Sequence, residues 1–583
     1  MPSHSKQHTW INRFVPGCGA ALFLSAAMTM TAPAGMAQEW QAAYGRPNAD
    51  ERFVWVREAQ GGGYLAVGNR DNVPFAYEQG IWAAGLTDNS GLAWNRRLHL
   101  RDATGADVYT FGTRIEESAD GTYFVVCGEA NQDTTTSQSI VVAAFDSALL
   151  TMRWADTMNG LYSTRADIRG TSIVQIPGTD EWLVAGRGRG FTGLRRRGYI
   201  YRFDALTGNV TSFFRYRDAA LAEESIIEFL DIEAVDDGYL ICGLTENYQT
   251  NDKDTLVLKL DPGLNVLWAK TYAIPDDRSE HARGMDICPN GDIVVTGNQN
   301  ANLTNGDTYV MRLHPDGSLQ WYYITPDITG TNSIEVSPEK SGESSVFPSR
   351  RRTGAGAQFA VLDHDATGAS ARWIRTYWSG YEWFGSALKT SDDVYFMVGE
   401  TESFGPGMAD GYAVRTNPCG ATPLGCPAPE NTLTLVPWEP IVTKVTIERH
   451  TGNPDWEDVT NLINLDEEPD ERRCPCLCDV GLSGVWTCPG GGPATFTVTN
   501  ATPFGPVALA YALSDGCYTI TSGPRCVGLE LAIAAPLAHA LATADVDGIA
   551  VFNGNIPPMA CGKLHLQAVD LNTCCPSNVL TVE

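Results

Sequence analysis

The sequence lacks the short motifs that mark common hydrolases and nucleotide-binding enzymes. No G-x-S-x-G, H-E-x-x-H or Walker A pattern occurs in its 583 residues, which include only nine histidines. Amphipathic helical stripes are also scarce, while short Val, Ile, Tyr and Phe runs bounded by Gly, Asp and Asn are frequent. The pattern therefore predicts an all-β protein and assigns no catalytic residue.

Basic residues are few relative to acidic ones. The chain has 41 Lys and Arg against 69 Asp and Glu, a formal net charge of −28. A negative field repels nucleic acid and anionic membranes and favours cations or basic partners. We therefore expect no nucleic-acid partner, and a highly solvated surface is the simplest explanation of the acidity.

Long apolar runs are absent beyond the N-terminus, where residues 1–37 have the pattern of a secretory signal peptide. Lys6 and Arg13 precede an apolar run over residues 19–31, and Gly35-Met36-Ala37 offers a small-x-small cleavage site. No later segment approaches the roughly 18 apolar residues that a membrane helix needs. We expect an exported mature chain without a transmembrane segment, either extracellular or in the cell envelope.

Cysteine is rare over residues 38–418, where Cys127, Cys242 and Cys288 are the only ones. Eleven of the 15 cysteines fall between Cys419 and Cys575. In an exported protein this clustering predicts disulfides in the C-terminal region. A metal site at the C-x-C-x-C run of residues 474–478 is the alternative, but this spacing is irregular for zinc and no histidine lies close by.

One strand pattern recurs along the chain and indicates its architecture. A turn, a buried strand and a glycine, as in NGDIVVTG, end at Gly68, Gly128, Gly186, Gly243, Gly297 and Gly399. We call these residues anchor glycines. Their spacings are 60, 58, 57, 54 and 102 residues, so a degenerate copy is expected midway through the last interval, at Gly342–Ser349. Seven units of 50–60 residues, each with about four strands, predict a seven-bladed β-propeller.

The spacing of the anchor glycines also places other strands of each unit. An aromatic residue recurs on the strand that follows each polar turn, at Trp154, Phe213, Trp268, Trp321 and Trp373. We expect these rings to pack between neighbouring units, because a sheet in such an array buries both faces. The seventh unit lacks this strand, and residues 39–45 match it. The N-terminal strand is therefore predicted to complete the last unit and remove the open edges.

The seventh unit, DDVYFMVGETESFGPGMADGYAVRTNPCG, resembles the repeat of bacterial secreted β-propeller proteins. The resemblance covers residues 40 to about 418 and implies an exported propeller, without implying a reaction. The stretch from GPATFTVTNATPFGPVALAYALS to the end of the chain resembles small β-sandwich domains of secreted bacterial proteins, whose function is unknown or related to attachment.

These observations divide the chain into a signal peptide (residues 1–37), a seven-bladed β-propeller (38–418), a linker (419–480) and a cysteine-containing β-sandwich (481–583). The linker is rich in Pro, Thr, Asp and Glu, and we expect one strand near residues 441–447 and a helical turn near 456–463. About seven short strands in the last 100 residues favour a small disulfide-stabilised sandwich.

An acidic ring at the axial opening is the candidate ligand site. Glu51, Glu280 and Glu382 each stand 17 residues before an anchor glycine, and Asn332 takes that place in the degenerate unit. A ring of oxygen ligands could hold calcium or attract a cationic ligand. Alternatively, each acid accepts local hydrogen bonds and has a purely structural role.

The function that this sequence favours is a secreted or cell-envelope scaffold, without enzymatic activity, that binds a protein or glycan partner. The alternative is an extracellular hydrolase or lyase with its site at the axial opening. His281 beside Glu280 could form a base–acid pair, but an adjacent pair has little specificity. The basic runs Arg195–Arg197 and Arg350–Arg352 are interpreted as solvated loops, with anion or polysaccharide contact as the alternative.

Overall fold

The described regular structure in this computed structural model consists of β-strands and two short 3₁₀ turns, Thr460–Leu462 and Pro558–Ala560. The structure describes residues 30–31 and 39–582 except 47–48, 73–79, 102–104, 106, 132–137, 149, 159–166, 190–195, 221–224, 248–251, 275–278, 300–305, 332, 340–341, 352–355, 378–381, 406–408, 423–427, 429, 432, 452–455, 459, 467–470, 478–479, 489 and 524. The all-β prediction is confirmed.

From residue 49 onward, consecutive antiparallel strands form units of four. Unit 1 contains β3 (Ala49–Glu58), β4 (Tyr64–Asn72), β5 (Gly80–Leu86) and β6 (Leu92–Arg101). Unit 2 contains β7 (Asp107–Glu117), β8 (Tyr123–Asn131), β9 (Gln138–Asp146) and β10 (Met152–Met158). Unit 3 contains β11 (Asp167–Gln175), β12 (Glu181–Arg189), β13 (Arg196–Asp204) and β14 (Val210–Asp218).

The later units repeat this order. Unit 4 contains β15 (Ser225–Val235), β16 (Gly238–Asn247), β17 (Asp252–Leu260) and β18 (Val266–Ala273). Unit 5 contains β19 (Glu280–Ile287), β20 (Ile293–Gln299), β21 (Thr308–Leu313) and β22 (Leu319–Thr325). Unit 6 contains β24 (Glu335–Glu339), β25 (Gly342–Arg351), β26 (Ala357–Asp365) and β27 (Gly368–Tyr377), with β23 (Ile328–Thr329) also paired to β25.

The last unit joins the two ends of the repeat region. Unit 7 contains β28 (Glu382–Lys389), β29 (Tyr395–Thr401), β30 (Asp410–Thr416) and the N-terminal strand β2 (Trp40–Gly45). Antiparallel pairing places Trp40 opposite Arg415 and Tyr44 opposite Gly411. The predicted use of the N-terminal strand in the last unit is therefore confirmed.

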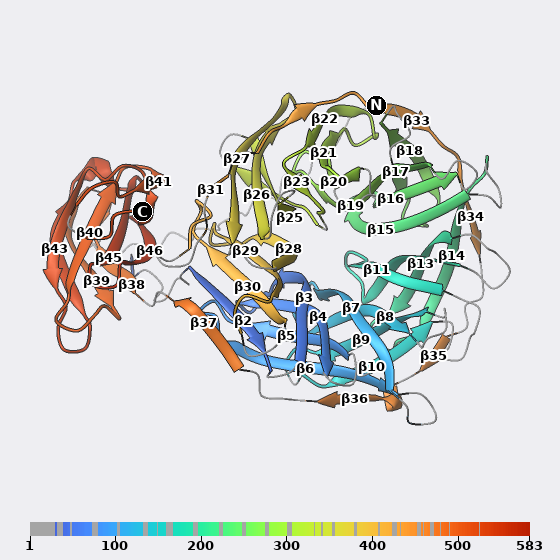
Figure 1. Ribbon diagram of the computed structural model, residues 1–583, viewed down its shortest axis with the longest axis horizontal. Helices are drawn as coiled ribbons and strands as arrows, with labels where there is room; N and C mark the ends of the chain where they lie inside the picture. The colour runs from blue at the N-terminus through green and yellow to red at the C-terminus, as the bar shows by residue number, and fades with distance from the viewer. Residues whose placement is uncertain are drawn as a thin grey trace, which may run out of the picture.

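The units lie around a ring, with the first strand of each toward the middle (Figure 1). Short bridges from β6 to β7 and from β9 to β11 join units 1–3 into one sheet, which reaches 15 strands with three short strands from residues 447–466. Each pair of neighbouring units shares a hydrophobic core, including one between unit 7 and unit 1. The arrangement is propeller-like, because burial on both faces of every sheet holds the array together.

The recurring aromatic residues lie in these shared cores, as predicted. Trp154 donates a hydrogen bond from Nε1 to the carbonyl of Ala205 in the next unit, at 2.7 Å. Trp321 makes the corresponding bond to Asp365 at 2.8 Å, and Trp40 makes it to Asp88 at 2.8 Å. Each indole thus buries its ring and satisfies its one donor across a boundary between units.

The anchor glycines have a steric cause. In units 1, 2, 3, 4, 5 and 7 the first strand carries a β-bulge opposite the anchor glycine. The bulge brings a carbonyl of the first strand onto the glycine, so that an added Cβ would overlap with Arg52, Phe111, Arg169, Glu228, His281 or Trp383. Only glycine fits there.

The degenerate unit supports this account. The Gly342–Ser349 segment lies in β25, the second strand of unit 6, and Val346 and Phe347 are buried as predicted. Ser349 replaces the anchor glycine, and the first strand is interrupted between β23 and β24 instead of bulged. Where the bulge is absent, a side chain larger than hydrogen is tolerated.

The expected linker is corrected by the structure, because residues 430–477 form short strands that line the outside of the ring (Figure 1). We call this segment the belt. Each belt strand pairs antiparallel with the outermost strand of one unit, in the order 6, 5, 4, 3, 2, 1, 7. The belt strands are β31 (Glu430–Asn431), β32 (Val436–Pro437), β33 (Ile441–Lys444), β34 (Ile447–Thr451), β35 (Trp456–Asp458), β36 (Ile463–Asp466) and β37 (Glu471–Leu477).

The C-terminal region contains two sheets with a common core. One comprises β38 (Gly481–Trp486), β39 (Gly492–Thr499) and β44 (Ala550–Ile556), with β1 (Met30–Thr31) paired to β38. The other comprises β43 (Ala538–Thr543), β40 (Pro506–Ala512), β45 (Leu564–Asp570) and β46 (Cys575–Val582). Their facing side chains form one cluster, and the hairpin of β41 (Asp515–Thr519) and β42 (Glu530–Ile533) covers part of the second sheet.

Three disulfides join described cysteines of this part of the chain: Cys419–Cys517, Cys488–Cys561 and Cys526–Cys574. Disulfides are typical of proteins that fold in an oxidising compartment. No helix among the described residues is long and apolar enough to cross a membrane. Apart from Met30–Thr31, the expected signal peptide lies outside the described residues and stays a prediction.

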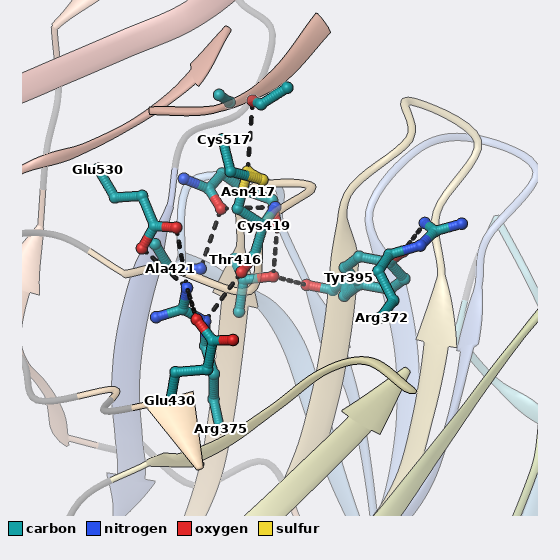
Figure 2. The surroundings of a disulfide bond; sticks show 12 residues. Arg372, Arg375, Tyr395, Thr416, Asn417, Cys419, Ala421, Glu430, Cys517 and Glu530 are labelled. Carbon is teal, nitrogen blue, oxygen red and sulfur yellow. Dashed lines mark hydrogen bonds and ion pairs between the residues drawn. A yellow bond between two sulfur atoms is a disulfide. The ribbon is translucent and has the colours of Figure 1, made fainter. Parts of the chain in front are cut away.

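Arg375 holds the C-terminal region against the ring beside the Cys419–Cys517 disulfide (Figure 2). Its guanidinium donates to the carbonyl of Cys419 at 2.8 Å, to the carbonyl of Ala428 at 2.9 Å and to both oxygens of Glu530 at 2.8 and 2.9 Å. Unit 6, the start of the belt and β42 therefore meet at one buried arginine.

We predict that Gly243→Ala lowers the free energy of unfolding by about 2–3 kcal/mol or more, because its Cβ would overlap with the carbonyl of Glu228. Urea denaturation measures the change. The control is Gly61→Ala, where nothing lies within 4 Å of the added Cβ and the effect should stay within about 0.5 kcal/mol. Equal effects at the two positions would contradict the steric explanation of the anchor glycines.

We also predict a strong coupling between Arg375 and Glu530. A double-mutant cycle of Arg375→Ala and Glu530→Ala should give an interaction energy of about 1–3 kcal/mol, since the pair is mostly buried and bidentate. Arg217 and Glu448, a more exposed pair between β14 and the belt, serve as the control and should give about 0–1 kcal/mol. A coupling for Arg375 no larger than the control would show that it does not hold the two regions together.

Candidate functional site

The first strands of the units surround the centre of the ring, and each contacts the first strand of the next unit. The bulged residues of units 1, 2, 3, 4, 5 and 7 are Val54, Thr113, Thr171, Leu230, Arg283 and Gly385. A Cβ on Gly385 would lie 2.6 Å from Cα of Val54, and Thr171 donates to the carbonyl of Phe229 at 2.9 Å. These residues form a close-packed layer, which we call the bulge layer.

Asp231 joins several units just beyond the bulge layer. Its carboxylate pairs with Arg114 of unit 2 and accepts hydrogen bonds from Ser172 Oγ of unit 3 at 2.8 Å and from the Met285 N–H of unit 5 at 3.0 Å. Arg114 also stacks on the Trp55 ring of unit 1, 3.3 Å from its centroid. Side chains from four different units and a backbone amide from a fifth therefore converge at the axis.

A layer of charged side chains follows. Arg57, Glu116, Glu233, Asp286 and Glu335 come from units 1, 2, 4, 5 and 6, and each pairs with the residue three positions before the anchor glycine or Ser349. We call these five residues the axial acidic layer. Val174 and Leu388 occupy the same register in units 3 and 7. One cation thus faces four carboxyl groups, all partly buried.

The pKa values in this layer reflect the crowding of like charges. Burial, with Asp286 and Glu116 nearby, raises the pKa of Glu335 to about 8 although Arg57 opposes the shift. Burial raises the pKa of Asp286 to about 6 against hydrogen bonds from the Val336 and Ile287 amides. The pKa of Glu233 is raised well above its usual value by burial and by Asp231 and Asp286.

Arg57 and Glu116 form the charge pair within this layer. Arg57 donates from Nε to Glu116 at 2.8 Å, and Trp55 donates from Nε1 to the other oxygen of Glu116 at 3.1 Å. The arrangement places Glu116, which is ion-paired with Arg57, beside Glu233 and Glu335, whose pKa values are raised by burial. Chemically, such a set can transfer protons or hold a cation.

The predicted acidic ring is placed differently. Glu51 is buried and ion-paired with Arg70 at 3.2 Å and Arg46 at 3.8 Å, and Glu382 accepts hydrogen bonds from Ser403 and from Thr401 at 3.4 Å. Glu280 is also buried, near Tyr309 and Tyr322 of its own unit. The three acids make separate contacts inside the units. Asn332 lies outside the described residues, and calcium binding by this set stays a prediction.

One further cluster has metal-ligand chemistry. Ligand atoms of Cys288, Glu343 and His364 lie within 4.8 Å of one another. However, the Arg312 guanidinium donates to Glu343 at 2.8 Å and lies 3.1 Å from Nδ1 of His364. A buried arginine already supplies the positive charge there, so the cluster is better explained as a polar contact between units 5 and 6 than as a metal site.

Sequence counting missed the axial acidic layer because hairpin lengths differ between units. The four carboxyl groups stand 12, 10, 11 and 14 residues before Gly128, Gly243, Gly297 and Ser349, although their pairing register is the same. A search by strand pairing, with the loop length left free, would have aligned them. Counting back a fixed 17 residues from each anchor glycine instead selected residues near the start of the first strand in each unit.

Comparisons with known proteins define no family for this chain. No known family and no curated protein matches it. Among solved structures, prolyl oligopeptidase B from Galerina marginata is similar at 10% identity and a TM-score of 0.35, over 78% of this chain and 56% of that chain. The rhamnogalacturonan lyase YesW is similar at 9% identity and a TM-score of 0.18, over 93% and 91%. The chain spans about half the length of the peptidase, and at these TM-scores neither similarity indicates a function.

We predict that Glu335→Gln makes stability less sensitive to pH. In the unfolded chain this carboxyl group loses its proton near pH 4.5, but in the folded protein only near pH 8, so wild-type stability should fall as the pH rises between these values. The melting temperature of the variant should therefore be higher than that of the wild type at pH 8, but not at pH 4.5. Thermal melts from pH 4.5 to 9 check this, with Glu448→Gln on the belt as the control. A pH-independent difference for Glu335→Gln would contradict the raised pKa.

Proposed function

We propose that this protein is an exported seven-bladed β-propeller, related to the bacterial secreted propeller proteins, that carries a C-terminal β-sandwich and acts as a non-enzymatic scaffold binding a protein partner. The arrangement of shared cores between successive units supports the propeller assignment, and the common core of the two C-terminal sheets supports the sandwich. The resemblance of the repeats to secreted proteins and the disulfides support export.

Exposed apolar side chains in the C-terminal region carry the binding proposal. Ten of the 15 large exposed hydrophobic residues in the described chain lie between Val485 and Met559. Only eight of residues 481–583 are Asp, Glu, Lys or Arg, although charged residues make up 19% of the whole chain. A weakly charged surface with clustered apolar side chains is typical of a protein-binding site.

Six of these residues follow one sheet edge. We call them the β43 surface: Phe504, Tyr511, Leu513, Leu537, Leu541 and Val546. The Leu537 amide donates to the Tyr511 carbonyl at 3.0 Å, and Leu541 pairs with Ala508 on β40. At the other end, the Phe504 amide donates to the Asp545 carbonyl at 3.2 Å.

The strand β43 itself is suited to pairing. Among the described residues it pairs with β40 alone, and its sequence, AHALAT, has no Lys, Arg, Asp, Glu or Pro. Leu541 is 65% exposed. Native proteins usually protect such an edge with charge or proline, so an unprotected edge is available for an added strand from a partner.

Site-specific photo-crosslinking tests the proposal. A photoreactive residue at Leu541 should capture a defined protein from the extracellular fraction of the source organism. The same residue at Leu206, which is exposed on the ring, is the control and should not capture it. Leu537→Lys combined with Leu541→Lys should abolish capture of that same protein by a probe placed at Tyr511. Equal capture at Leu206 and Leu541, or none at either, would contradict a binding site at the β43 surface.

A hydrolase or lyase acting at the axis is the second candidate, favoured by the axial acidic layer. With a pKa of about 8, Glu335 is protonated at neutral pH and could act as a general acid beside Glu116, which is ion-paired with Arg57. Turnover of a polysaccharide or peptide that is lost in Glu335→Gln and kept in Glu448→Gln would establish this function and overturn the scaffold proposal.

A further inference from the structure

The opposite side of the bulge layer carries basic side chains near the axis. Arg187 and Arg196 of unit 3 and His281 and Arg283 of unit 5 gather around Glu228 of unit 4. Glu228 and His281 occupy the same register, each opposite the residue after an anchor glycine, and Arg283 is the one charged member of the bulge layer. Three successive units thus supply one basic cluster in a strongly acidic protein.

Glu228 is ionised and shared by two of these cations. Arg187 pairs with one carboxylate oxygen, and Arg196 donates to the other at 2.6 Å. Burial alone would raise the pKa of Glu228, but Arg187 and Arg196 hold it below its usual value. The Glu228 side chain is only 4% exposed, while that of Arg187 is 23% exposed. The carboxylate therefore lies at the back of the cluster, and the arginine reaches solvent.

Positive charge remains in excess of this carboxylate. Burial and the neighbouring Arg187 lower the pKa of Arg283, with Glu228 only partly opposing them. Burial, Arg283 and Lys253 lower the pKa of His281 to about 3. Burial and neighbouring positive charge therefore both disfavour the charged forms of these groups, and an added negative charge would offset the neighbouring positive charge.

Buried nitrogen atoms of the cluster lack hydrogen-bond partners as well. Nε of Arg187, Nε of Arg283 and Nε2 of His281 are buried and have no hydrogen-bond partner among the residues that the structure describes. A buried N–H without an acceptor costs free energy, and a guanidinium without one costs more. Packing between units 3, 4 and 5 explains why these side chains are buried. It supplies neither a hydrogen-bond acceptor for their N–H groups nor a negative charge to balance the arginines.

An oxyanion supplies both. Carboxylate, phosphate and sulfate groups present several oxygen acceptors, and arginine binds them through two parallel N–H groups. We propose that Arg187, Arg283 and His281 form a binding site for the oxyanion group of a small ligand, with Glu228 fixing the arginines behind it. The site lies on the strand-start side of the axis, away from the axial acidic layer. It does not depend on the β43 surface, so its failure would leave the proposed partner binding unaffected.

Calorimetric titration of the full mature chain tests this site. Inorganic phosphate, sulfate and galacturonate are titrated separately at low ionic strength, and at least one should bind with a Kd below about 10 mM and raise the melting temperature. Binding of galacturonate alone would identify a sugar carboxylate as the ligand group, and binding of phosphate or sulfate alone would identify an inorganic or ester oxyanion. If none of the three binds, the proposal is wrong.

Variants distinguish this site from general attraction to a basic surface. Arg283→Gln and Arg187→Gln should each weaken binding at least tenfold, because each removes charge and donors. Glu228→Gln keeps an oxygen acceptor that holds the arginines but removes the negative charge that repels an oxyanion, so it should strengthen binding several-fold. Arg202→Gln is the control, since Arg202 pairs with Glu181 elsewhere in unit 3, and its affinity should match the wild type. Wild-type affinity in both Arg187→Gln and Arg283→Gln would overturn the assignment.

Discussion

This architecture depends on one constraint. The outermost strand of each four-stranded unit has unpaired backbone N–H and C=O groups that must be covered. An exposed edge invites pairing with another chain, and it is usually covered or blunted. Here residues 430–477 cover the outermost strand of each unit, passing from unit 6 back to unit 1 and finally to unit 7. In unit 7 the covered strand is β2, which also joins the N-terminus to the end of the repeats. Completion of unit 7 and protection of its outer edge therefore rely on the same strand.

The belt also connects the ring to the C-terminal sheets. The residues just before it are fixed by the Cys419–Cys517 disulfide and by Arg375, which donates to the Ala428 carbonyl and to Glu530. Arg375 also pairs with Glu430 at the start of the belt, at 3.7 Å. The end of the belt leads directly from β37 into β38. The C-terminal region is therefore attached at both ends of the belt, while the edge at β43 is left uncovered among the described strands.

Charge is separated along the axis by the bulge layer. On one side Arg187, Arg196 and Arg283 lie around one carboxylate, and on the other side four carboxyl groups face Arg57. The separation follows from strand geometry, because residues on the two sides of the bulge occupy fixed registers in successive units. Each register collects side chains from different parts of the sequence into one layer. The bulge exists because an anchor glycine leaves room for the carbonyl of the first strand.

The sequence by itself determined the strands, their order and the boundaries of the repeats, including the degenerate copy at Ser349 and the N-terminal strand of unit 7. These depend on local patterns: two-residue alternation, recurring glycines and buried aromatic residues such as Trp154. Only the tertiary structure decided the belt and the axial layers. The sequence predicts a strand near residues 441–447, but Ile441–Lys444 is exposed along its whole length, so no buried face indicates that it pairs with β18. The charges of Arg57 and Glu335 meet because hairpins of different lengths end in the same register, and sequence spacing does not record that register.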